Sequence, residues 1–264
     1  MRLSPPYPLV LGLTGLLLVT ALPSLADGNP KLGANAIPIQ GSHEYLQSSA
    51  APDYWALSPY YLPQGTASSC SVAAIAMLVN ALRGLPASEE VPLVTEQALL
   101  EAAVIPRWRL QTAENGSGVT WDELQRYVRA SLQAFDVAAQ VDVLKPEDAS
   151  AASLAQVRSW LMQNEETDED IVLVYFNQGV LTGSWDGPHI SPIAAYDARR
   201  RRALVMDVDR QWYVPYWVAD DKLLEAMLKP APSSRGALAG QTGGLIRATR
   251  QRPQPPKGAP RDPR

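Results

Sequence analysis

Cysteine and histidine are almost absent from this sequence, which has one cysteine and two histidines in 264 residues. A single cysteine excludes an intramolecular disulfide and a metal site built from several thiolates. With only His43 and His189 available, a zinc site would depend on carboxylate ligands. The H-E-x-x-H motif of zinc peptidases and a glycine-rich phosphate loop are also missing. The sequence therefore predicts that the protein requires no metal and no other cofactor of its own.

Strong positive charge and long apolar runs are lacking too. The formal net charge is −4, which argues against a nucleic-acid partner. Beyond the first residues of the chain, no apolar stretch is long enough to cross a bilayer. The length suits one fair-sized globular domain or two small ones, and we expect no membrane contact of the mature protein. Composition does not predict its oligomeric state.

Residues 1–26 have the features of a signal peptide. Arg2 supplies the positive start, residues 9–19 form an uncharged apolar run, and Ser24 and Ala26 place small residues at the cleavage positions. The apolar run is short for a transmembrane helix. We therefore expect export to the periplasm with cleavage near Ala26, and the alternative is an uncleaved, membrane-tethered form.

Composition divides the rest of the chain into three parts. Residues 27–44 are rich in Gly, Asn, Pro and Ala and predict an extended leader. Residues 45–229 carry the periodic apolar patterns of a folded domain. From residue 230 to 264 Pro, Gly, Ser and Arg dominate, and this bias predicts a mostly disordered tail.

The only cysteine stands where a polar loop meets an apolar helical pattern. After Cys70, apolar residues recur at helical spacing, among them Val72, Ile75 and Val79, and Gly84 is placed to end the helix. Unpaired N–H groups and the helix dipole at a helix N-terminus stabilise a thiolate, which is the form that attacks carbonyl carbons. A small buried core cysteine is the alternative interpretation.

The order of the other predicted elements indicates an α+β fold, with helices first and strands later. Thr120 and Glu123 form a capping-box pattern that starts one of the helices. Pro146 occupies the first position of the next one. The apolar patterns predict helices near residues 95–103, 120–132 and 146–164, and strands over residues 137–144, 171–176, 189–196 and 203–208.

His189 and Asp207 are the residues most suited to assist a cysteine nucleophile, which needs a base and a group that orients it. Asp207 lies between apolar residues of a predicted strand, where a carboxylate needs a partner. If the hairpin folds about residues 197–202, His189 and Asp207 lie opposite each other with Cβ atoms about 5 Å apart. Asp207 would then fix the tautomer of His189, whose other nitrogen would face Cys70. An ordinary buried strand histidine is the alternative.

Gln64 completes the candidate site. It lies in the loop before Cys70, so its side-chain amide and the Cys70 N–H would form the two donors of an oxyanion hole. A cysteine at a helix N-terminus upstream, followed by a strand histidine and an aspartate downstream, is the order found in papain-like peptidases.

At these residues the sequence resembles the phytochelatin synthases, and above all their short bacterial, glutathione-cleaving members. The likeness spans most of the predicted domain. It is carried by residues 64–84 around the cysteine, by Gly-Pro-His-Ile-Ser-Pro-Ile-Ala-Ala-Tyr at 187–196, by Leu-Val-Met-Asp-Val at 204–208 and by residues 210–218.

The resemblance implies a papain-like fold in which Cys70, His189 and Asp207 are catalytic and Gln64 belongs to the oxyanion hole. It implies glutathione, or a related γ-glutamyl peptide, as the substrate. Attack on the cysteinyl–glycine amide would release glycine and leave a γ-glutamylcysteinyl thioester on Cys70. The matching segments also suggest substrate-binding roles, assigned to Arg210, Tyr213 and Arg235.

Departures from the family pattern favour hydrolysis of this thioester over transfer to a second glutathione. Trp212 stands where the family usually has a lysine, so a cationic contact for an acceptor peptide is missing. Asn177 and Gln178 replace a basic pair, which would weaken the grip on a substrate carboxylate. The cysteine-rich C-terminal region of plant members has no counterpart here. Stimulation by heavy-metal ions, as in metal detoxification, would therefore act through substrate thiols.

Two other functions fit the same residues. One is a papain-like peptidase or amidase that acts on a different small peptide. The other is a catalytically inactive binding protein of the cell envelope, whose cysteine would react no faster than a free thiol.

Overall fold

The computed structural model describes residues 32–42 and 44–251. The predicted signal peptide, His43 and residues 252–264 lie outside this part of the chain. Within it, no helix combines the length and the apolar character that a membrane span requires.

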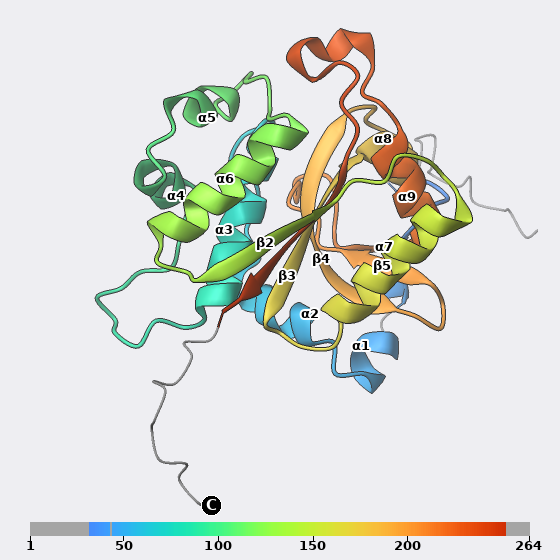
Figure 1. Cartoon of the computed structure of the whole chain (residues 1–264), viewed down its shortest axis with the longest axis horizontal. Coiled ribbons are helices and arrows are strands. Elements are labelled where there is room, and N and C mark those ends of the chain that lie inside the picture. Colours follow the sequence, from blue (N-terminus) through green and yellow to red (C-terminus); the bar gives the residue numbers. More distant parts are fainter. Residues whose placement is uncertain (1–31, 43, 252–264) are drawn as a thin grey trace, which may run out of the picture. The chain divides into compact units, whose positions relative to one another are not determined.

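Helices and strands alternate irregularly along the described residues (Figure 1). The helices are α1 (Glu44–Ser48), α2 (Pro52–Leu57), α3 (Cys70–Arg83), α4 (Glu96–Ala102), α5 (Pro106–Gln111), α6 (Trp121–Ala134), α7 (Ala151–Asn164), α8 (Gln178–Thr182) and α9 (Asp220–Leu228), with short 3-10 helices η1 (Ile39–Gly41), η2 (Ser58–Tyr60) and η3 (Ser233–Leu238). The strands are β1 (Ala36–Pro38), β2 (Ala139–Leu144), β3 (Asp170–Asn177), β4 (Pro188–Asp197), β5 (Arg202–Val205), β6 (Tyr216–Ala219) and β7 (Gly244–Arg250).

One antiparallel sheet organises these elements. Its seven strands within the described residues follow the order β1-β6-β5-β4-β3-β7-β2, and every neighbouring pair runs antiparallel. An antiparallel sheet combined with helices confirms the α+β class predicted from the order of the sequence patterns.

The inner strand β3 lies between two apolar cores. All of its residues are buried, as its continuous apolar run predicts. Successive side chains of a strand point to opposite faces, so Ile171, Leu173 and Tyr175 enter a core with α3 and α6, whereas Val172 and Val174 enter one with α7 and α9. Figure 1 shows these helix pairs on opposite faces of the sheet. The sheet is therefore sandwiched between helices.

The helix after the cysteine is buried on all sides. Residues 71–82 of α3 are all buried, which is typical of a helix inside a core rather than at a surface. Gly84 follows with φ +73°, a conformation that favours glycine, and so ends the helix where the sequence predicts. The N-terminus of α3, which carries Cys70, is thereby held rigidly by the core.

The helix predicted to begin at Pro146 begins instead at Ala151. Ser150 is its N-cap, because the Ser150 hydroxyl accepts from the Ser153 N–H at 3.2 Å. Asp148 precedes the helix and accepts from the Ser150 N–H at 3.0 Å. A serine cap followed by alanines therefore outweighs the proline signal.

The domain boundaries drawn from composition at residues 45 and 229 are wrong. Within the predicted leader, β1 pairs with β6 at one edge of the sheet. Within the tail predicted to be disordered, β7 lies between β3 and β2 and pairs with both. Both flanking segments thus contribute strands to the fold.

Entry into β7 depends on a glycine. A Cβ atom on Gly243 would lie 1.7 Å from the carbonyl oxygen of Tyr175 in β3, so no other residue fits this close approach of two backbones. Leu245, Ile246 and Ala248 then become fully buried in the sheet. A run of seven residues therefore joins the core from a segment whose overall composition is polar.

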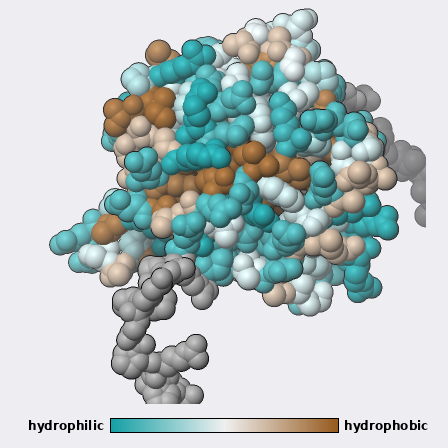
Figure 2. Space-filling view, viewed as in Figure 1, coloured by the Kyte–Doolittle hydropathy of each residue, from teal (hydrophilic) through white to brown (hydrophobic). Residues whose placement is uncertain are grey.

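The sheet is less protected at its β2 edge. Figure 2 shows apolar residues at the surface in a band across the region where β2 and β7 lie in Figure 1. Val143 of β2 is 41% exposed, while Val174 of β3 is fully buried. Burial of the sheet therefore decreases from the centre towards this edge.

A second buried carboxyl, Asp53 of α2, is not part of the candidate site. Asn164 Nδ2 donates to Asp53 Oδ2, and Asp53 Oδ1 and Asn164 Oδ1 have no partner among the described residues. Burial raises the pKa of Asp53 well above its ordinary value of 3.8, and the charges of Asp170, Glu165 and Asp168 raise it further. Ionisation of Asp53 therefore opposes folding.

We expect Asp53→Asn to raise the free energy of unfolding by about 1–2 kcal/mol near pH 8, because an amide is cheaper to bury than a carboxylate and can donate to Asn164. A carboxyl with a raised folded-state pKa weakens the fold as pH rises from about 4 towards that pKa, so the gain should shrink near pH 5. Urea unfolding of both proteins at the two pH values measures the difference. An equal gain at both would contradict the prediction.

Candidate active site

Cys70 is the first residue of α3, and a network of hydrogen bonds holds the loop before it. Glu96 of α4 accepts from the Gly65 N–H at 3.1 Å and from the Ser69 hydroxyl at 2.9 Å. The Ser68 hydroxyl donates to the Gly116 carbonyl at 2.7 Å. The cysteine therefore projects from a fixed turn at the end of a buried helix.

The same loop is attached to the segment that carries the aspartate. The Gln64 N–H donates to the Val208 carbonyl at 2.8 Å, and the Tyr61 hydroxyl donates to the Asp207 carbonyl. These two bonds join the helical part that holds Cys70 to the sheet part that holds Asp207.

His189 and Asp207 form a buried pair. The distance from His189 Nε2 to Asp207 Oδ1 is 2.8 Å, and the residues are 3% and 0% exposed. A hydrogen bond with the side chain of Cys70 is one of the interactions that act on the imidazole. Because Nε2 is occupied by Asp207, Nδ1 is the nitrogen left for the sulfur.

The predicted contact is present, but the register from which it was derived is wrong. Strand β5 ends at Val205, and a bulge in β4 between Ile193 and Ala195 shifts the pairing. Asp207 therefore lies beyond the paired part of the hairpin, not opposite His189 within it. After β5 the chain continues beside β4, since the Met206 N–H donates to the Pro192 carbonyl at 2.9 Å, and this brings the carboxylate to the ring.

The electrostatics of the pair favour an imidazolium and a carboxylate. Burial alone would lower the pKa of His189, but the charge and hydrogen bond of Asp207, with the contribution of Cys70, raise that pKa well above 6.5. Burial alone would raise the pKa of Asp207, but His189 and donors that include the Asp209 N–H and Tyr216 lower it below 3.8. The ring can therefore hold the proton that a neighbouring thiol gives up.

We expect Asp207→Asn to lower the pKa of His189, because the charge that offsets burial is lost. The chain has two histidines, so ¹⁵N-histidine NMR resolves the titration. A His43→Gln variant assigns the signals. An unchanged titration of His189 would contradict the pairing.

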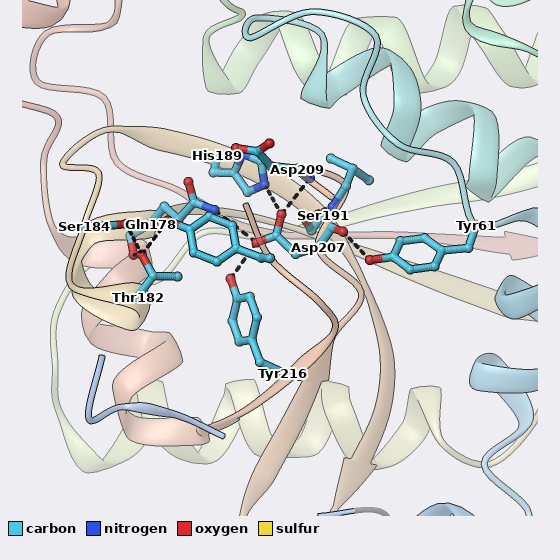
Figure 3. Close-up of polar contacts among 11 residues, drawn as sticks. Tyr61, Gln178, Thr182, Ser184, His189, Ser191, Asp207, Asp209 and Tyr216 are labelled. Carbon is cyan, nitrogen blue, oxygen red and sulfur yellow. Dashed lines mark hydrogen bonds and ion pairs between the residues drawn. The ribbon is translucent and has the colours of Figure 1, made fainter. Parts of the chain in front are cut away.

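Two further side chains contact Asp207 and were not predicted from sequence. Figure 3 shows the Gln178 amide and the Tyr216 hydroxyl directed at its carboxylate. The family pattern predicts only that Gln178 weakens the grip on a substrate carboxylate. In the structure Gln178 is 2% exposed and donates to Asp207 Oδ2 at 3.0 Å. The signal that could have found these residues is the demand of a buried carboxylate for several donors.

A cavity of about 1000 Å³ opens at Cys70 and His189. Its walls are formed by residues from five segments, 64–70, 114–119, 178–190, 209–213 and 234–238. Trp185 and Trp212 are 38% and 54% exposed and line it. The volume is sufficient for a small peptide.

The three predicted substrate-binding residues differ in position. Tyr213 and Arg235 line the cavity, and Arg210 is not among its lining residues. The Arg210 guanidinium lies 4.4 Å from the centre of the Tyr61 ring, and that of Arg235 lies 4.3 Å from the centre of the Trp185 ring. Arg210 therefore supports the loop that leads to Cys70, while Arg235 stands at the cavity wall.

Gln64 lines the cavity near Cys70, as an oxyanion-hole donor must. Its Oε1 is buried with no partner among the described residues. The hydrogen bond from the Gln64 N–H to the Val208 carbonyl fixes the position of the Gln64 backbone, from which this side chain extends.

In the described part of the chain, no three His, Cys, Asp or Glu side chains cluster so that they could hold a metal ion. The arrangement of Cys70, His189 and Asp207 suits acid–base and nucleophilic chemistry.

Comparison with known proteins identifies relatives. A family model described as phytochelatin synthase matches residues 34–237. Glutathione gamma-glutamylcysteinyltransferase 1 of Lotus japonicus is 24% identical over 217 residues, which cover 80% of this chain and 39% of that protein. Glutathione gamma-glutamylcysteinyltransferase 2 of Arabidopsis thaliana is 24% identical over 187 residues, which cover 70% of this chain and 38% of that protein.

The chain spans less than two fifths of the length of these relatives, 39% and 38%. The family match nevertheless extends over most of the chain and includes Gln64, Cys70, His189 and Asp207. The chain belongs to the phytochelatin synthase family.

Proposed function

We propose that the protein cleaves the cysteinyl–glycine amide of glutathione through a γ-glutamylcysteinyl thioester on Cys70. The observation that carries this proposal is the buried His189–Asp207 pair, 2.8 Å apart, beside Cys70 in a cavity of about 1000 Å³. Family membership supports it, as do relatives named glutathione gamma-glutamylcysteinyltransferase.

In the first step the Cys70 sulfur attacks the carbonyl carbon of the cysteinyl residue, after its proton has passed to His189. The imidazolium then protonates the amide nitrogen, the C–N bond breaks, and glycine leaves. Asp207 keeps the ring oriented and stabilises its charge throughout. The negative oxygen of the tetrahedral intermediate accepts hydrogen bonds from the Gln64 side chain and the Cys70 N–H.

In the second step His189 removes a proton from water, whose oxygen attacks the thioester carbon and releases γ-glutamylcysteine and the free thiol. We propose that water outcompetes a second glutathione, because Trp212 stands at the cavity where the family pattern has a lysine. An apolar indole offers no charge to hold an acceptor carboxylate. Metal ions would affect the rate only when they are bound to the thiolates of substrate molecules.

We further propose a papain-like arrangement, in which the helix that starts at the nucleophile packs against an antiparallel sheet that carries the base. Contacts between α3 and β4 support this, since β4 carries His189. Tyr213 and Arg235, at the cavity wall, are the proposed contacts for the substrate carboxylates.

Incubation of the purified protein with glutathione tests the proposed function. We expect equimolar glycine and γ-glutamylcysteine, and a Cys70 adduct with the mass of a γ-glutamylcysteinyl group after rapid acid quenching. Longer γ-glutamylcysteinyl products would instead show transfer. Cleavage of other peptides in a panel, with none of glutathione, would identify a different papain-like peptidase. If no substrate is turned over, the interpretation as a catalytically inactive binding protein would be supported.

Export is a separate proposal that rests on residues 1–26. N-terminal sequencing of protein recovered from the periplasm should give a start near residue 27. Recovery of the full-length chain in the membrane fraction would support the tethered form instead.

A further inference from the structure

The carboxylate of Asp207 accepts four hydrogen bonds and is fully buried. His189 Nε2 and the Asp209 N–H donate to Oδ1 at 2.8 and 2.9 Å. Gln178 Nε2 and the Tyr216 hydroxyl donate to Oδ2 at 3.0 and 2.8 Å. Each oxygen therefore has two donors, and the carboxylate cannot rotate without breaking several of these bonds at once.

The two donors to Oδ2 are themselves held by the backbone. Gln178 is the first residue of α8, and its N–H donates to the Gly187 carbonyl at 3.0 Å. Tyr216 is the first residue of β6 and pairs with Pro38 on one side and Val205 on the other. Figure 3 shows both side chains converging on the oxygen of Asp207 that does not face His189.

Both donors are neutral, and this matters for the imidazole. A lysine or arginine at position 178 would place a cation against Asp207 and would compete with His189 for its charge. The amide and the phenol donate hydrogen bonds without such competition. Burial and the Asp207 charge raise the pKa of Tyr216 far above its ordinary value, so the phenol keeps its proton.

We propose that Gln178 and Tyr216 are positioning residues, which hold Asp207 so that His189 is oriented and charged beside Cys70. They act on the reaction through Asp207 and need not touch the substrate. The kinetic tests of this proposal rest on the proposed function, whereas the test by alkylation of Cys70 does not.

The first experiment compares Gln178→Ala and Tyr216→Phe with the wild type in glutathione cleavage. We expect each to lower kcat by roughly tenfold, the effect of losing one hydrogen bond to a charged group, with KM changed less than about twofold. Tyr196→Phe is the matched control, because the buried Tyr196 hydroxyl donates to the carboxylate of Asp220 at 2.7 Å, away from the cavity lining. Its kcat should equal that of the wild type.

A conservative variant separates positioning from packing. In Gln178→Glu the new carboxyl can donate to Asp207 only while it is protonated. We therefore expect its activity, relative to the wild type, to be near normal at acid pH and to fall as pH rises. A merely structural role of Gln178 would give a ratio that does not change with pH.

Alkylation of Cys70 by iodoacetamide provides a readout without glutathione. Loss of a donor leaves Asp207 and the imidazole less well held, so His189 assists the reaction of the thiol less effectively. We expect the alkylation rate near pH 6 to drop in Gln178→Ala and Tyr216→Phe but not in Tyr196→Phe. If the wild type cleaves no glutathione, the proposed function fails while this measurement still tests the positioning. Folded Gln178 and Tyr216 variants that alkylate and turn over at the wild-type rates would overturn the proposal.

Discussion

Replacing Cys70 by alanine should abolish glycine release from glutathione. Loss of a catalytic nucleophile typically lowers kcat by about 10⁴-fold to 10⁶-fold, because binding and the oxyanion hole alone remain. No other cysteine exists in the chain to form the thioester. Cys70→Ala should also show no adduct in the mass spectrum after incubation with glutathione. Quantification of glycine over several hours measures the residual rate.

The fold should survive this change, because Cys70 is only partly buried at the start of α3. A melting temperature close to that of the wild type is the control for folding. His189→Ala should reduce turnover nearly as far, because the nucleophile and the base act as a unit. Equal glycine release by the wild type and Cys70→Ala would remove the proposed mechanism.

Ending the chain after Gly243 should prevent stable folding, although composition predicts that this part of the chain is mostly disordered. The truncation removes β7, which lies between β3 and β2 and pairs with both. Three fully buried side chains are lost, Leu245, Ile246 and Ala248. Burial of a large aliphatic side chain contributes about 1.5–3 kcal/mol. Their loss, together with two strand ladders, is comparable with a total stability of about 5–15 kcal/mol.

A stop after Gln251 is the matched control, because it leaves every strand of the described sheet in place. We expect this shorter deletion to unfold cooperatively in urea, and the stop after Gly243 to show no cooperative transition. Ile246→Asp in the full-length chain should also destabilise strongly, since it buries a charge between two strands. A native-like transition of the chain that ends at Gly243 would contradict the role of β7.

Local signals predicted several elements well. The helix after Cys70 ends at Gly84 as expected, because glycine tolerates the positive φ of a helix end. Thr120 and Glu123 form the predicted capping box. The continuous apolar run at 171–176 is a strand buried on both faces. Each of these features depends on neighbours within a few residues, which a sequence displays directly.

The site was predicted in part. Its chemically distinctive residues are few, so the lone cysteine, His189 and the buried Asp207 could be grouped by chemistry alone. The bulge in β4 and the end of the regular pairing at Val205 could not be predicted, because register and bulges depend on packing between strands. Gln178 and Tyr216 carry no local signal either, since glutamine and tyrosine occur in many other environments.

The sequence by itself determined the local elements, the α+β class and the choice of Cys70 as the candidate nucleophile, because these follow from spacing, capping and the scarcity of cysteine and histidine. Only the tertiary structure decided that β1 and β7 belong to the sheet and that Asp207 reaches His189 beyond the hairpin. It also decided that Gln178 and Tyr216 hold the carboxylate. The physical reason is that these contacts join residues far apart in the chain. The free energy of such contacts depends on burial and on how closely two backbone segments approach, rather than on the neighbouring residues in sequence.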